Sequence, residues 1–274
     1  MIPTRRSTST KPNPALINTD KGASTGKAAA GRRRLAAAGA VSNAEWLKAS
    51  GFKTGILLLG GNSVTHFRIR VAQSQLRRDL LPSLWSVVGI LTADDGFISV
   101  PLDGLADSAT IPYQNGVQHC SMADYDDPAR YPNIGILDHG LDPERVLHSA
   151  RDLMTQRSLL DLPALMLPWL GYVWAAGDQP NPLLQSKGLP SAAFIEMVYA
   201  MVGLELTPGL AAASSCPEAI WQSALWWHEY YLSRRGGESR SKRKAPRGKY
   251  LARQQAASAV GPKDRMAGDR VVQK

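Results

Sequence analysis

The sequence predicts one α+β domain, with a small, mainly antiparallel sheet and packed helices, between two basic tails. Short apolar runs of strand length fill the first half of the middle region, and longer helical patterns follow them. Strands that precede helices, rather than alternate with them, are typical of the α+β class. We therefore place the domain at residues 45–233 and the tails at residues 1–44 and 234–274.

The predicted strands are apolar runs bounded by turn residues. Residues 55–59 form a buried strand that enters Gly60-Gly61, which we interpret as a turn because a phosphate loop would need a Gly-Lys-Ser/Thr ending. Asp94-Asp95-Gly96 predicts a hairpin. The remaining strands are expected at 85–91, 97–102, 117–121 and 131–137.

The predicted helices follow from apolar periodicity together with cap residues and prolines at their ends. They are expected at 44–50, 66–80, 142–156, 159–167, 169–176, 191–202 and 217–232. The last of them is rich in tryptophan and tyrosine. Its aromatic surface is either core packing, which we favour, or a surface that binds a partner.

The net charge of +9 is unevenly distributed along the chain. The tails carry +7 and +10, so the domain between them carries −8. Binding to a polyanion, if any, is therefore expected in the tails. Both tails lack sustained apolar periodicity, which predicts disorder. The N-terminal tail also has the composition of an organellar transit peptide, but we favour an ordinary disordered tail.

Two cysteines, Cys120 and Cys216, offer neither a disulfide framework nor paired zinc-ligand spacing, so a reducing, cytoplasmic location is expected. No apolar stretch is continuous enough for a transmembrane segment or a secretory signal. Asp124, Asp126 and Asp127 lack the glycine and glutamate of a calcium loop and predict Asx turns. We expect no metal and no cofactor.

Three segments together resemble the circularly permuted papain-like hydrolases, relatives of bacterial cell-wall peptidases and amidases. The segments are Thr54-Gly-Ile-Leu-Leu-Leu, Trp85-Ser-Val-Val-Gly-Ile and Ser191-Ala-Ala-Phe-Ile, and the resemblance covers about residues 52–206. It implies a strand, then a strand that carries the catalytic histidine of the family, and then a helix that begins at the nucleophilic cysteine.

The chain departs from the family at both catalytic positions. Val87 stands where the resemblance places the imidazole, and Ser191 stands where it places the thiol. A serine hydroxyl needs a neighbouring base even more than a thiol does, and valine cannot act as one. On the following strand, where the family has its orienting polar residue, only Ser99 is polar.

Two other pairings of a nucleophile with a histidine could restore hydrolase activity. His119 could serve Ser191, or Cys120 could act as the nucleophile with His119 or His66. A lone histidine or cysteine on a strand is more often structural, and Cys216 before Pro217 is better explained as a residue at a helix start.

Three functions follow from these observations. The favoured one is a non-catalytic papain-like domain, a binding or scaffold module whose basic tails contact a protein or another anionic partner. The first alternative is an amide or ester hydrolase of the same fold that uses Ser191 or Cys120 with His119. The second is a protein that associates non-specifically with nucleic acid through its tails, since only Tyr250 lies near the basic run as a stacking aromatic.

Overall fold

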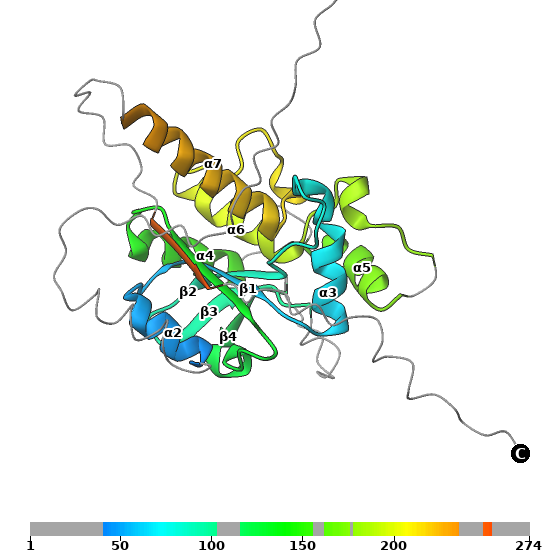
Figure 1. Cartoon of the computed structure of the whole chain (residues 1–274), viewed down its shortest axis with the longest axis horizontal. Coiled ribbons are helices and arrows are strands. Elements are labelled where there is room, and N and C mark those ends of the chain that lie inside the picture. Colours follow the sequence, from blue (N-terminus) through cyan, green and yellow to red (C-terminus); the bar gives the residue numbers. More distant parts are fainter. Residues whose placement is uncertain (1–40, 103–115, 156–161, 176–177, 236–248, 254–274) are drawn as a thin grey trace, which may run out of the picture.

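The computed structural model of the protein describes residues 41–102, 116–155, 162–175, 178–235 and 249–253 (Figure 1). Helices accompany a six-stranded sheet of order β4-β3-β2-β1-β5-β6, in which every neighbouring pair is antiparallel. This confirms the predicted α+β class and the antiparallel sheet. The strands are β1 (Gly55–Gly60), β2 (Val87–Leu91), β3 (Gly96–Ser99), β4 (Gln118–Ser121), β5 (Asn133–Asp138) and β6 (Lys249–Arg253).

Strand β1 forms the centre of the sheet because its whole length is apolar and buried. Leu57 is in register with Gly89 of β2 on one side and with Ile136 of β5 on the other. The predicted hairpin joins β2 to β3, and Asp95 takes the left-handed conformation within it, with a φ of 57°. The buried strand at 55–59 and the hairpin at Asp94-Asp95-Gly96 therefore agree with the sequence prediction.

The two faces of the sheet carry layers of unequal size (Figure 1). Alternate residues of β1 point to opposite faces, as the pleat requires. Ile56 and Leu58 join the larger cluster, which most of the helices cover, whereas Leu57 and Leu59 pack beneath α2. The helices are α2 (Asn43–Ser50), α3 (Val64–Ala72), α4 (Pro143–Thr155), α5 (Leu162–Val173), α6 (Pro190–Met201) and α7 (Pro217–Arg235). Short 3-10 turns are η1 (Ser74–Leu76), η2 (Met122–Tyr125), η3 (Pro182–Gln185) and η4 (Ala212–Ser214).

Helix α2 begins with a capping box, which explains why so short a segment is helical. The Ser42 hydroxyl accepts a hydrogen bond from the Glu45 backbone N–H, and Gly51 ends the helix with a φ of 77°. The buried Asn43 amide then fixes the helix on the sheet by donating to the carbonyls of Tyr125 at 2.7 Å and Tyr131 at 3.0 Å.

Two predicted helices differ in extent from those observed. The segment predicted at 66–80 ends as a regular helix at Ala72, where the Gln73 amide turns inward and donates to the Trp85 carbonyl at 2.8 Å. The two helices predicted at 159–167 and 169–176 form one helix, α5, that contains Pro168. Residues 159–161 and 176 lie outside the described part.

Strand β6 was not expected, because its sequence lies within the predicted C-terminal tail. It pairs with β5, with Arg253 opposite Ile134. The Arg253 guanidinium donates to the Val41 carbonyl at 2.7 Å and to the Asn43 side chain. A segment distant in sequence therefore completes one edge of the sheet and holds the start of α2. Residues 1–40, 236–248 and 254–274 of the predicted tails lie outside the described part.

Candidate functional site

Ser191 lies in the first turn of α6, behind Pro190, so the predicted helix start is present here. Ser191 is only 2% exposed. The helix that carries it, α6, packs against β2. The backbone N–H of Leu189 donates to the Ser215 carbonyl at 2.9 Å, which seats the start of α6 against the segment before α7. A hydroxyl this buried is poorly placed to meet a substrate from solution.

Val87 points away from α6. It is paired with Leu59 of β1 and packs in the smaller cluster beneath α2, whereas its neighbour Val88 packs in the cluster that contains α6. The position where the resemblance expects an imidazole is therefore apolar and also on the opposite face of the sheet from Ser191. Ser99 is fully buried, and its hydroxyl donates to the Val88 carbonyl at 2.6 Å.

His119 lies on β4, at the edge of the sheet. Its Nε2 is 3.4 Å from the Thr92 hydroxyl and 3.6 Å from the Asp94 carboxylate, both next to the β2–β3 turn. The pKa of Asp94 is lowered, chiefly by a hydrogen bond from Thr92. Within the described part of the chain, the polar contacts of His119 do not include Ser191.

Cys120 follows His119 on the same strand, so the two side chains point to opposite faces of the sheet. Cys120 pairs with Phe97 and packs in the cluster beneath α2. His66 lies elsewhere, on α3, where its ring contacts Tyr131 with centroids 5.2 Å apart. Ser191 and His119 are therefore not bonded to each other in the described part of the chain, and a catalytic role for Ser191, Cys120 or His119 stays a prediction.

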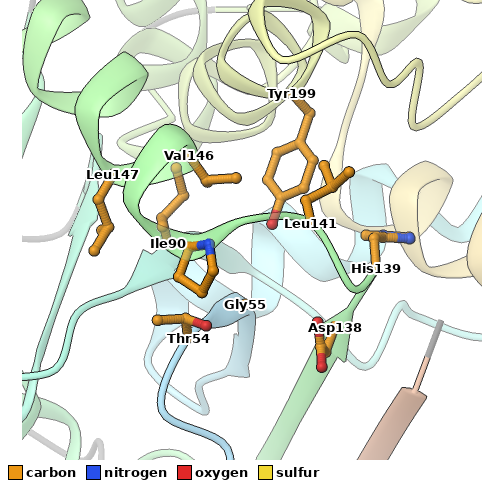
Figure 2. A pocket seen from close by; sticks show the side chains of 10 residues that line it. Thr54, Gly55, Ile90, Asp138, His139, Leu141, Val146, Leu147 and Tyr199 are labelled. Atoms are coloured by element: carbon orange, nitrogen blue, oxygen red, sulfur yellow. The ribbon is translucent and has the colours of Figure 1, made fainter. Parts of the chain in front are cut away.

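A small cavity beside Gly55, the first residue of β1, brings together polar groups that sequence analysis missed (Figure 2). Thr54, Asp138, His139 and Tyr199 line it among apolar side chains, and the Tyr199 hydroxyl points inward. Its volume of about 10 Å³ is close to that of one water molecule. The sequence signal for this cavity was the pair of polar residues, Asp138 and His139, directly after the apolar run of β5.

The electrostatics of this cavity favour neutral groups. Burial lowers the pKa of His139, and burial together with the charge of Asp138 raises the pKa of Tyr199. At neutral pH the imidazole and the phenol are both uncharged. The arrangement can order one water molecule, but the space excludes an organic substrate.

Cys216 is fully buried at the start of α7, as expected for a residue at a helix start. Nearby, the buried Glu218 carboxylate accepts hydrogen bonds from the Ser83 hydroxyl and the Gln222 amide, each at 2.6 Å. The Glu218 N–H donates to the Gln73 side chain at 2.9 Å. These bonds join α3, the segment before β2 and α7, so we assign the cluster a structural role.

The acidic loop makes contacts within the fold, and the aromatic helix is only partly buried. Asp126 accepts a hydrogen bond from the Ala44 N–H at 2.7 Å, and Asp127 accepts one from the Ala129 N–H at 2.8 Å. In α7, Trp221 is buried, whereas the exposed Trp226 stacks on Tyr230 with centroids 5.3 Å apart. The described residues contain no group of three or more histidine, cysteine, aspartate or glutamate side chains suited to a metal ion.

One surface combines exposed apolar side chains with arginines. Helix α3, η1 and the loop that follows them expose six large apolar side chains, which we name the α3 face. These are Val64, Phe67, Val71, Leu76, Leu80 and Leu81. Arg68 donates to the Val173 carbonyl at 2.9 Å, which places the end of α5 and the exposed Trp174 beside this helix (Figure 1).

No protein-family model, no curated protein and no solved structure matches the chain. The papain-like resemblance therefore stays a prediction. Among the described helices, none combines the length and the apolar character needed to cross a membrane.

Proposed function

We propose that the chain is a non-catalytic, papain-like binding module that holds an anionic partner with the help of its basic tails. The observation that carries this proposal is the opposite placement of Val87 and Ser191, with the valine beneath α2 and the serine buried in the first turn of α6. A nucleophile without a base and without access to solvent does not support acyl transfer.

Charge supports the binding half of the proposal. Residues 45–233 carry −8, and the two predicted tails carry +17, of which Arg234, Arg235, Lys249 and Arg253 contribute +4 within α7 and β6. The other +13 lies outside the described residues. Flexible or extended cationic segments attract polyanions over about a Debye length, and salt screens this attraction. The α3 face adds a second exposed surface.

The first experiment compares the full chain with Ser191→Ala in assays with chromogenic esters and amides. We expect no turnover above background for either protein, because the residue at the family's base position is Val87, on the opposite face of the sheet from Ser191. Turnover by the wild type that Ser191→Ala abolishes would establish the hydrolase instead. Cys120→Ser and His119→Ala, tested in parallel, would identify a rearranged site.

The same protein is then bound to immobilised heparin and eluted with salt. Neutralising four cations of the C-terminal tail is expected to lower the salt concentration needed for elution, whereas neutralising four exposed cations of the domain should change it less. Equal effects of the two variants would contradict a role for the tail. The tail variant carries glutamine at Arg240, Lys242, Arg243 and Lys244, and the control carries it at Lys48, Lys53, Arg145 and Arg151.

A further inference from the structure

We propose that the α3 face docks this protein on an anionic lipid surface, an inference that rests on the proposed function and names its partner. The first observation is the arrangement of the side chains on α3. Val64, Phe67 and Val71 recur at spacings of three and four residues, so they share one side of the helix. All three are exposed, Phe67 by 51%, which is the reverse of a core-facing stripe.

The loop after η1 presents two further leucines in a fixed conformation. The Asp79 carboxylate accepts two hydrogen bonds from Arg77, at 2.9 Å and 2.6 Å, and one from the Leu81 N–H at 3.1 Å. Leu80 is 70% exposed and has a φ of 55°, a left-handed conformation that costs energy for leucine. The fold thus keeps the Leu80 side chain exposed to solvent even though the backbone at this residue is strained.

The loop and the helix form one surface because they are bonded to each other. The Ser83 N–H donates to the Arg70 carbonyl at 2.9 Å, and Arg70 Nε donates back to the Ser83 carbonyl at 2.6 Å. The loop therefore leaves the end of α3 and returns to it. Leu80 and Leu81 lie on a short excursion between these two points.

Charge selects the kind of partner. Residues 64–81 contain four arginines and one acidic residue, Asp79, which gives this segment a net charge of +3, although the domain as a whole is acidic. Arg78 is exposed beside the leucines. An apolar surface on a segment of net positive charge, with Arg78 exposed, matches the boundary between acyl chains and anionic headgroups, where apolar side chains insert and cations meet phosphate.

The exposure of these apolar side chains suits a lipid layer. A protein partner would need a preformed groove to receive them. A lipid surface deforms around such side chains without a preformed groove. The basic tails supply the second attachment that stable membrane binding requires.

The test is co-sedimentation of the full chain with vesicles of phosphatidylcholine alone or of equal parts phosphatidylcholine and phosphatidylserine. We expect binding to the mixed vesicles only. Phe67→Glu should weaken it by about tenfold or more, because the buried area of one large apolar side chain corresponds to at least that factor. The matched control is Met201→Glu, since Met201 is exposed by 52% at the end of α6 and lies outside the α3 face.

Leu80→Asn separates binding from folding. Asparagine tolerates the left-handed conformation better than leucine, so this variant should be at least as stable as the wild type and yet bind mixed vesicles more weakly. Unfolding in urea checks the first expectation and co-sedimentation the second. A variant that is both stable and weakly bound cannot be explained by loss of the fold.

The remaining outcomes overturn the proposal in distinguishable ways. Equal vesicle binding by the wild type, Phe67→Glu and Leu80→Asn would mean that the tails act alone, and the α3 face would not be a lipid site. Heparin binding without vesicle binding would overturn the lipid assignment of the α3 face and leave the proposed function standing. Absence of binding to both heparin and vesicles would refute the proposed function itself.

Discussion

At the scale of single residues, Cys216 shows how the fold can make a reactive group inert. Its side chain is fully buried at the start of α7. Burial is the largest cause that raises the pKa of its thiol to about 12, and the neighbouring charges of Glu218 and Glu196 add to it. Since the thiolate is the reactive form of cysteine, Cys216 is not a nucleophile in the folded protein.

The raised pKa of Cys216 predicts a loss of stability in alkali. Between the ordinary value of 9.0 and about 12, the unfolded chain releases the thiol proton while the folded chain keeps it. The free energy of unfolding should therefore fall as pH rises above 9.0, by about 1.4 kcal/mol per pH unit from this group.

Urea unfolding of the wild type and Cys216→Ala across this range measures that contribution. The variant is expected to start less stable, because it leaves a cavity, but to lose stability less steeply with pH. Parallel slopes for the two proteins would show that Cys216 titrates normally in the folded state. Comparing slopes removes the shared titration of the tyrosines and lysines.

At the scale of elements, the end of β1 depends on the absence of a side chain. A Cβ atom on Gly60 would lie 1.8 Å from the backbone oxygen of Leu84, and a backbone atom cannot move aside as a flexible side chain can. The Gly60-Gly61 pair therefore permits close packing against the segment that enters β2. This supports the interpretation as a turn over a phosphate loop.

Two alanine substitutions test this requirement with opposite expected signs. Gly60→Ala should lower the free energy of unfolding by roughly 3 kcal/mol or more, because the clash involves backbone. Gly171→Ala, within α5, should raise it by about 0.5–1 kcal/mol through helix propensity, since its nearest neighbour is the flexible Gln179 side chain at 3.2 Å. Urea denaturation measures both, and a neutral Gly60→Ala would contradict the close approach.

At the scale of the whole molecule, the sheet separates a large helical layer from a thin one. The thin layer consists mainly of α2 and η2, and Arg253 of β6 holds the start of α2 through Val41 and Asn43. Elements with few buried neighbours open at lower free energy than the core. The thin layer and β6 are therefore expected to form one weakly held unit.

Native-state hydrogen exchange can detect this unit. Amides of α2 and β6 should exchange together, at a lower free energy than those of β1, β2 and α6. Arg253→Ala should increase exchange in α2 and leave β1 unchanged, whereas Lys53→Ala, an exposed cation near α2, serves as the control. Exchange of α2 and β1 at the same free energy would show that the domain opens only as a whole.

The sequence alone determined the features that depend on local chemistry. The apolar run of β1, the hairpin at Asp94-Asp95-Gly96 and the capped α2 are encoded by neighbouring residues, and all three occur as predicted. The position of Ser191 at a helix start was equally accessible, because Pro190 and the apolar pattern behind it are local signals.

The tertiary structure decided the features that depend on distant partners. Strand β6 has no apolar pattern of its own and forms against the edge of β5, and Leu80 is held outward by a loop that closes on Arg70. Likewise, the sequence shows that Val87 is not a base, but only the sheet register shows that it faces away from α6. Register and burial arise from contacts between segments far apart in the chain, so no window of sequence contains them.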